Sequence, residues 1–175
     1  MNIIFLDIDG VLNSEESIVR FYEEAMSKGQ PNYNCDEIFP KEYMNNLKEL
    51  VEETDSKIVI SSTWRMFYPD NDKWFKLMSN LKEYNLDTKV IDRTPYTSKK
   101  RGDEIRMWLS EHPEVSNFVI IDDDSDMCEF TETKLAKSSW KNGFTKEVKD
   151  KALMILKCIS NADMIASERI GIWTK

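Results

Sequence analysis

Residues 3–10 read Ile-Ile-Phe-Leu-Asp-Ile-Asp-Gly, the most informative stretch of the chain for its fold. Four consecutive apolar residues are typical of a buried strand, and here they end in two carboxylates and a glycine. Alternation along an extended chain places Asp7 and Asp9 on the same side, where their charges repel and favour a cation or a shared proton. Two interpretations remain open for this stretch alone: an acidic surface turn, or a metal-centred site at a strand end. A calcium loop is disfavoured, because no further oxygen ligands follow at the alternating spacing.

The composition is that of an ordinary globular protein. With 175 residues, of which 41% are hydrophobic and 32% charged, we predict a single domain over residues 1–175. The net charge of −8 argues against broad nucleic-acid binding, although it leaves room for a small local basic patch. No apolar run approaches the roughly 20 residues that span a bilayer, and no signal peptide is recognisable. We therefore expect a cytoplasmic protein without a membrane partner.

Strand-like and helix-like segments alternate along the chain. After the first strand, the pattern predicts strands at 57–61, 88–91, 117–122 and 134–140, and helices at 14–28, 41–53, 72–84, 102–111 and 145–158. Continuously apolar strands between helices are typical of a parallel sheet that is covered on both faces. The predicted fold is therefore α/β, with three layers: a Rossmann-like, mostly parallel sheet with helices on both sides.

Polar residues follow three of these strands. They are the Asp7-Ile-Asp9 stretch, residues 61–65 (Ser-Ser-Thr-Trp-Arg) and residues 122–126 (Asp-Asp-Asp-Ser-Asp). Ligands of an open parallel sheet bind at the carboxyl ends of its strands, so these clusters are expected to share one crevice. Several carboxylates there would suit Mg²⁺. One aspartate could attack a phosphate as a nucleophile and a second could move protons, while the basic run 99–101 (Lys-Lys-Arg) supplies a balancing cation.

With these strand-end clusters and the basic run, the sequence resembles the haloacid dehalogenase (HAD) superfamily of phosphotransferases. Its first motif, an apolar strand followed by Asp-x-Asp-Gly, is matched at residues 5–12 (Phe-Leu-Asp-Ile-Asp-Gly-Val-Leu). The second, an apolar strand ending in Ser or Thr, is matched at 58–61. The third, a Lys or Arg before a helix, falls within 99–101, and the fourth, a strand ending in paired acids, at 119–123.

The resemblance implies a role for each matched residue. Asp7 is expected to be the nucleophile and a metal ligand, and Asp9 the general acid–base, with its backbone carbonyl also on the Mg²⁺. Ser61 is expected to bind phosphate through its hydroxyl. Asp123 is the expected direct carboxylate ligand of the fourth motif, while Asp122 is either a second ligand or holds a metal-bound water.

The third motif leaves a choice among Lys99, Lys100 and Arg101. Lysine is the usual residue of the superfamily, which favours Lys100 as the phosphate-facing cation. Arg101 is the close alternative, because it directly precedes the predicted helix and a guanidinium suits bidentate phosphate contact. Lys99 is expected to contact the substrate. The acids beyond the usual pair are less defined: Asp124 is either part of the site or simply solvated, and for Asp126 we favour an outer or surface role.

The intervals between the motifs leave room for little or no cap domain, beyond a small helical insert at about residues 14–40. Residues 61–65, followed by Arg-Gly-Asp-Glu-Ile at 101–105 and by the paired acids at 122–123, also resemble the phosphatase modules of nucleic-acid end-repair proteins and of viral polynucleotide kinase-phosphatases. Gly10, Ser62 and Arg65 are then expected to contact the substrate. Trp64 could stack on a base, but burial against the sheet is the interpretation we favour.

The predicted function is that of a Mg²⁺-dependent phosphomonoesterase with an aspartyl-phosphate intermediate. Its substrates would be nucleotides, 3′ or 5′ nucleic-acid phosphate ends, or another phosphorylated small molecule. Two alternatives remain: a catalytically silent binding protein that keeps the fold, and a phosphotransferase of the same superfamily. Dehalogenation is disfavoured, because the second acid, Asp9, serves phosphate chemistry.

Overall fold

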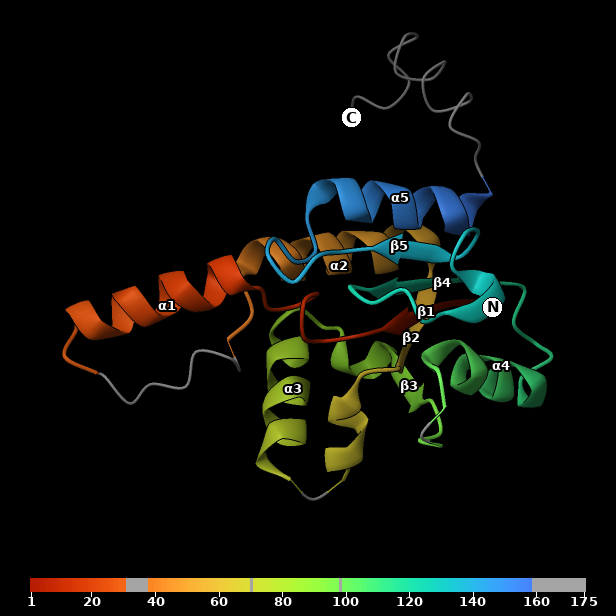
Figure 1. The fold of residues 1–175 in the computed structure, drawn as a ribbon, viewed down its shortest axis with the longest axis horizontal. Helices are drawn as coiled ribbons and strands as arrows, with labels where there is room; N and C mark the ends of the chain where they lie inside the picture. The colour runs from red at the N-terminus through yellow and green to blue at the C-terminus, as the bar shows by residue number, and fades with distance from the viewer. Residues whose placement is uncertain (31–37, 70, 98, 159–175) are drawn as a thin grey trace, which may run out of the picture.

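The computed structural model describes residues 1–30, 38–69, 71–97 and 99–158. Its centre is a sheet of five parallel strands in the order β3-β2-β1-β4-β5 (Figure 1). The strands are β1 (Asn2–Leu6), β2 (Ser56–Ile60), β3 (Val90–Arg93), β4 (Asn117–Asp122) and β5 (Leu135–Lys137). Every pairing is parallel, which confirms the predicted α/β class and the parallel sheet.

Helices connect the strands and cover the sheet. They are α1 (Glu15–Ser27), α2 (Lys41–Thr54), α3 (Asp72–Glu83), α4 (Arg101–Glu111) and α5 (Lys146–Lys157), with short 3₁₀ turns η2 (Thr63–Phe67), η3 (Asp87–Lys89) and η4 (Cys128–Phe130). These helices agree with the predicted ranges to within a residue at each end. The two edge strands differ more from their predicted ranges of 88–91 and 134–140. β3 begins only at Val90, after η3, and β5 already ends at Lys137.

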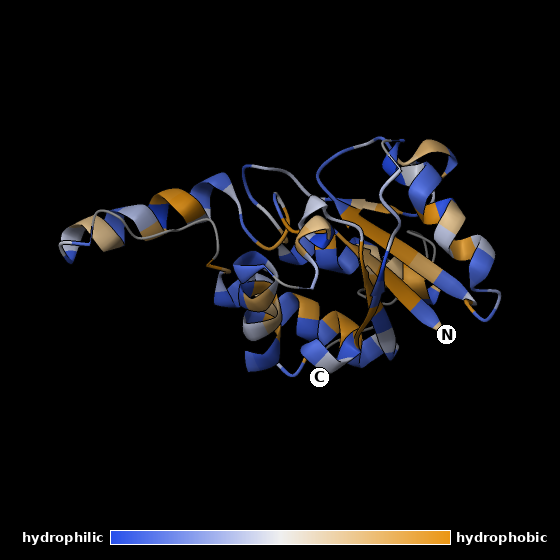
Figure 2. Cartoon of the chain, turned by 90° about the horizontal axis from the view of Figure 1, so that it is seen from below, coloured by the Kyte–Doolittle hydropathy of each residue, from blue (hydrophilic) through white to orange (hydrophobic). Residues whose placement is uncertain are grey.

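Side-chain alternation along β1 divides the core between the two faces of the sheet. Ile4 and Leu6 belong to one buried cluster with residues of α2, α3 and α5. Ile3 and Phe5 belong to the other, which includes Ile105 of α4. Figure 1 shows α4 on the opposite side of the sheet from α2 and α5, and Figure 2 shows that the strands are predominantly hydrophobic. The predicted arrangement of helices on both faces is therefore confirmed.

The hydrogen-bond ladder continues one residue beyond the central strands. The Asp7 amide donates to the Ile121 carbonyl, and the Ser61 amide donates to the Leu6 carbonyl, both over 3.0 Å. Similarly, the Thr94 amide, after β3, donates to the Ile60 carbonyl over 3.0 Å. The first polar residue after each strand is therefore held by the adjacent strand, and the polar ends of β1, β2 and β4 lie side by side.

Helix α1 projects away from the carboxyl edge of the sheet (Figure 1). Ser14 caps it, since its hydroxyl accepts from the Ser17 amide over 3.2 Å. Only Ser17 and Ala25 of this helix are buried. The predicted insert at about residues 14–40 thus begins with an exposed helix, and its segment 31–37 lies outside the described residues. No helix in the described ranges is long and apolar enough to cross a membrane.

Candidate active site

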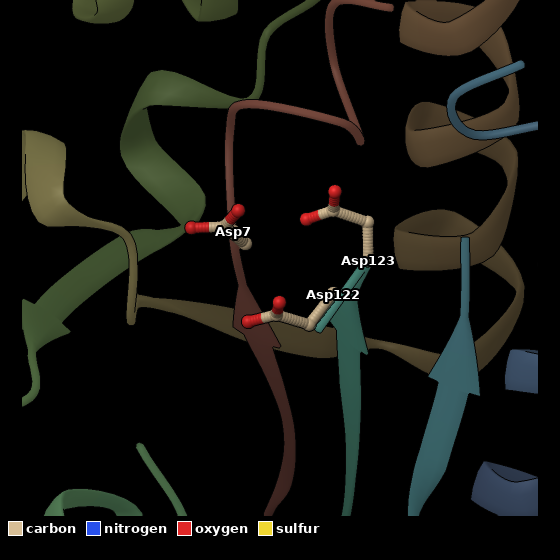
Figure 3. Close-up of side chains that lie close together, drawn as sticks. All are labelled: Asp7, Asp122 and Asp123. Atoms are coloured by element: carbon tan, nitrogen blue, oxygen red, sulfur yellow. The ribbon is translucent and has the colours of Figure 1, made fainter. Parts of the chain in front are cut away.

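Three carboxylates meet at the carboxyl edge of the sheet. Asp7 follows β1, Asp122 ends β4, and Asp123 comes next in the chain. One oxygen of each lies within 4.8 Å of the others, and the side chains face a common space (Figure 3). Asp7 is 6% exposed and Asp122 is fully buried. We call these three residues the acidic cluster. They lie close together because β1 and β4, whose ends carry them, are paired in parallel.

Among the described residues, Arg101 is the cation that forms ion pairs with the acidic cluster. Its Nη1 donates to Asp7 Oδ1 over 2.8 Å and to Asp122 Oδ2 over 2.9 Å. Lys99 and Lys100 precede the helix, and both are exposed. Helix α4 begins at Arg101, where the backbone amide donates to Asp126 Oδ2 over 3.1 Å. The structure therefore brings Arg101 to the cluster rather than Lys100, the residue favoured by the sequence, because the helix start turns Arg101 inward.

Burial opposes ionisation of these acids. It raises the pKa of Asp122 to about 8, with the charge of Asp7 acting in the same direction and Arg101 against it. Burial is also the main cause that raises the pKa of Asp7, again opposed by Arg101. The pKa of Asp123 is raised, first by burial and then by the charge of Asp7. One guanidinium thus leaves the cluster short of positive charge, which favours a bound cation.

The acidic cluster fits a Mg²⁺ ion by the chemistry of its donors. Three carboxylates supply hard oxygen ligands, and their short mutual separation allows them to contact one ion. The side chain of Asp9 does not belong to this group among the described residues. Asp7, Asp122 and Asp123 are therefore the side chains that would hold the metal.

Asp9 is oriented by two side chains that sequence reasoning did not connect to it. Its Oδ1 accepts from Asn13 Nδ2 over 2.9 Å, and its Oδ2 accepts from Trp64 Nε1 over 2.8 Å. Trp64 is only 2% exposed, which confirms the expectation that it is buried. The Trp64 contact spans 55 positions in the sequence, so no local pattern could have revealed it.

Gly10 allows the first loop to pass close to the acidic cluster. Its φ is +75°, in the left-handed region, and a Cβ at this position would lie 2.4 Å from Asp123 Cγ. Its carbonyl accepts from the Ser138 hydroxyl over 2.7 Å. Only glycine satisfies both the backbone conformation and the close approach. Gly10 therefore shapes the site through its backbone.

Two serines follow β2 beside the cluster. Ser62 hydrogen-bonds to Asp7 through its side chain, which counteracts the burial-driven rise in the pKa of Asp7. The Ser61 hydroxyl is buried and has no hydrogen-bond partner within the part of the chain that the structure describes. A buried hydroxyl without a partner destabilises the fold, because it has lost its hydrogen bonds to water. A ligand oxygen at this point would accept a hydrogen bond from the hydroxyl and remove that penalty.

Arg65 faces a different partner from the one expected. Its Nη2 pairs with Glu104 Oε2 over 2.5 Å, and the two side chains are 4% and 3% exposed. Its Nη1 donates to the carbonyls of Ser61 and Ser62 over 2.5 and 2.6 Å. Glu104 also accepts from the Thr97 amide over 2.8 Å. Arg65 is therefore joined to the loop after β2 and to helix α4, and sequence reasoning missed Glu104 altogether.

The two remaining acids after β4 have separate positions. Asp124 is exposed, and its backbone amide donates to Asp122 Oδ1 over 2.9 Å. Asp126 is exposed as well, and its carboxylate accepts from the Arg101 amide. Asp126 thus supports the start of α4 from outside the acidic cluster, in agreement with the outer role that we favoured.

Comparison with known proteins agrees with this geometry. The family model described as "HAD domain in Swiss Army Knife RNA repair proteins" matches residues 3–148. The chain belongs to this family. The matched range of the HAD domain includes the strand ends that carry Asp7, Ser61 and Asp122, as well as Arg101. No curated protein matches the sequence, and no solved structure matches it.

Proposed function

We propose that this HAD domain is a Mg²⁺-dependent phosphomonoesterase that works through an aspartyl-phosphate on Asp7. The observation that carries the proposal is the convergence of the acidic cluster, the unpaired Ser61 hydroxyl and the Arg101 guanidinium at one edge of the sheet. This set offers a nucleophile, a hydrogen-bond donor and a cation to one phosphate. The second motif acid, Asp9, lies in the same loop as Asp7.

In the first step, a carboxylate oxygen of Asp7 attacks phosphorus, and the bond from phosphorus to the leaving oxygen breaks. Asp9 gives its proton to that oxygen. In the second step, Asp9 takes a proton from water, the resulting hydroxide attacks phosphorus, and the Asp7–phosphate bond breaks to release inorganic phosphate. The hydrogen bonds from Asn13 and Trp64 hold Asp9 in one orientation for both transfers.

Charge balance comes from the residues around the phosphate. Bound Mg²⁺ would neutralise phosphate oxygens and reduce their repulsion toward Asp7. Arg101 already contacts Asp7, so its other donors can bind a phosphoryl oxygen as charge develops there. The Ser61 hydroxyl donates to a second phosphoryl oxygen. Lys99 and Lys100 can contact the substrate from the exposed end of α4, outside the acidic cluster.

The substrate that we propose is a phosphorylated nucleic-acid end or a nucleotide. The description of the family, which places such HAD domains in RNA repair proteins, supports this class. The net charge of −8 is compatible with recognition of one strand end, since a short end needs only local positive charge.

A phosphatase screen tests the proposal. Wild-type protein is assayed with Mg²⁺ on 3′- and 5′-phosphorylated oligonucleotides, mononucleotides, sugar phosphates and an aryl phosphate, with Asp7→Asn as the matched inactive variant. We expect release of phosphate, fastest from an oligonucleotide or a nucleotide, and a loss on the order of 10³-fold or more in Asp7→Asn. Unchanged hydrolysis in Asp7→Asn would refute the mechanism. A preference for a free sugar phosphate over every nucleotide would refute the substrate class, and phosphate transfer to an added alcohol instead of water would identify a phosphotransferase.

A further inference from the structure

An aromatic side chain stands exposed next to the loop that carries Ser61. Tyr96 follows β3 and is 59% exposed. The Arg65 guanidinium carbon lies 5.5 Å from the centre of its ring. Arg65 in turn donates to the Ser61 carbonyl. The Tyr96 ring is thus connected to the phosphate-facing loop through a single side chain, while much of its surface remains accessible.

A pocket lies beside this ring. Its volume is about 370 Å³, and Tyr96, Arg93, Met66, Met107 and Trp108 are among the residues that line it. This volume lies within the range of small-molecule sites, which is roughly 300–1,000 Å³. The exposed Met66 and Met107 side chains add apolar surface next to the aromatic ring.

Of the two arginines that line the pocket, Arg65 is paired with Glu104, whereas Arg93 has no carboxylate partner among the described residues. Arg93, Lys99 and Lys100 form no ion pair among the described residues, whereas Lys149 and Lys157 on α5 are each paired with a glutamate of α2. The Arg93 guanidinium lies 3.8 Å from the centre of the Tyr68 ring. Arg93 is therefore available to a phosphate of a bound strand, and Lys99 and Lys100 follow Tyr96 closely in the chain.

Carboxylates inside the pocket favour a base over a second phosphate there. Asp92 lines it and accepts from Trp108 Nε1 over 2.6 Å, and Glu111 lines it as well. These oxygens would repel a phosphate but can accept from the amino groups of a nucleobase. The exposed ring and the apolar side chains offer a stacking surface, and the phosphates of a strand would remain near Arg93 and Lys99.

We propose that this pocket is a nucleoside subsite, in which the base of the terminal phosphorylated nucleotide stacks on Tyr96 while Arg93 and Lys99 face the strand. The inference rests on the proposed function and names how the same site recognises its substrate. Aromatic side chains beside unpaired cations are the combination that binds single-stranded nucleic acid.

The test compares two oligonucleotides with the same terminal phosphate, one with an ordinary terminal nucleoside and one that is abasic at that position. The phosphate is placed at the end, 3′ or 5′, that the wild-type protein hydrolyses faster. We expect wild-type kcat/KM to be roughly tenfold higher on the oligonucleotide with the base, given the contribution of one base–aromatic stack. Tyr96→Ala should lose this preference by slowing only on that substrate, and Tyr96→Phe should retain it.

Tyr22→Ala is the matched control, since Tyr22 is 50% exposed on α1, away from the pocket. It should leave both rates unchanged. An equal loss on both oligonucleotides in Tyr96→Ala, or no loss on either, would overturn the subsite. Wild-type protein that hydrolyses both oligonucleotides equally fast would overturn the subsite and leave the phosphatase function intact. If wild-type protein hydrolyses an aryl or sugar phosphate but neither oligonucleotide, the proposed substrate class itself fails.

Arg93→Gln provides a second measurement. We expect a several-fold higher KM on both oligonucleotides, an unchanged kcat, and a salt dependence of kcat/KM that is shallower than in the wild type, because one cation that faces the phosphates is removed. An unchanged KM with an unchanged salt dependence would remove Arg93 from the subsite.

Discussion

Arg65 and Arg101 are two inward-facing arginines at the same edge of the sheet, but their surroundings differ. Arg65 contacts one carboxylate, that of Glu104, and two backbone carbonyls. The negative charge of Glu104 therefore balances its positive charge. Arg101 meets Asp7 and Asp122 directly. The first environment is electrically neutral, whereas the second retains an excess of negative charge.

This difference separates structural from chemical roles. Burial lowers the pKa of Arg65, and the charge of Glu104 opposes that effect. By contrast, the carboxylates around Arg101 overcome the effect of burial and raise its pKa. A balanced pair gains nothing from a further ion, while an unbalanced cluster can take up Mg²⁺ and a phosphate.

Glu104→Ala should have the largest effect on stability. It leaves the Arg65 guanidinium buried without its carboxylate, which we expect to lower the free energy of unfolding by about 3–5 kcal/mol. Urea denaturation followed by circular dichroism measures the change. The matched control is Arg106→Ala, which breaks the exposed pairs with Glu129 and Asp103 and should leave the stability nearly unchanged, because solvent screens exposed ion pairs. Equal effects in the two variants would contradict the structural role of the Arg65–Glu104 pair.

Arg101→Ala should affect catalysis more than stability. Removing the cation that faces the developing charge is expected to lower kcat by roughly 10²- to 10³-fold. Arg101→Lys should recover part of the rate, since it restores the charge but not the planar donor geometry. Steady-state kinetics on the best substrate of the screen, together with the Tm of each variant, separates the two effects. A normal kcat in Arg101→Ala would remove this residue from the site.

Mg²⁺ should stabilise the protein through the acidic cluster. At a metal concentration of 100 times the Kd, linkage predicts about 2.7 kcal/mol of added stability. Thermal denaturation with and without EDTA measures it, without any need for a substrate. Asp123→Asn should lose most of the effect, whereas Asp124→Asn, at an exposed position, should keep it. A Mg²⁺ response that survives in Asp123→Asn would place the ion elsewhere.

Lys100→Ala should have the smallest effect of the set. Lys100 is exposed and precedes the first residue of α4, so we expect less than about a twofold change in kcat and a change in stability within about 0.5 kcal/mol. The same kinetic and thermal assays as for Arg101 apply. A loss of kcat comparable to that of Arg101→Ala would return Lys100 to the role that the sequence favoured.

Much of this site could be anticipated because its residues follow strands with strong local patterns. Asp7 and Asp122 each end an apolar run. In a parallel sheet the ends of neighbouring strands lie at the same edge, so the two residues come together once β1 and β4 pair. The edge strands were harder to delimit. β3 and β5 each pair with a neighbour on one side only, so register and turns decide where they begin and end as much as their own residues do.

The roles of the basic residues could not be anticipated in the same way. Lys99, Lys100 and Arg101 are adjacent and chemically similar, and only the direction in which helix α4 begins selects Arg101. The partner of Arg65 lies 39 positions away, on another element. No periodicity in the sequence connects these two positions, so the expected contact between Arg65 and the substrate could be weighed only once Glu104 was seen beside it.

The class of fold, the family and the edge of the sheet where the acids gather all follow from the amino-acid sequence alone. These follow from hydrophobic periodicity and from short motifs, which are local properties of the chain. By contrast, the folded chain is needed to see that Arg101 meets the acidic cluster, that Arg65 is neutralised by Glu104, and that Trp64 orients Asp9. Such pairings depend on side-chain direction and on distances between elements far apart in the chain, and packing of the helices against the sheet sets both.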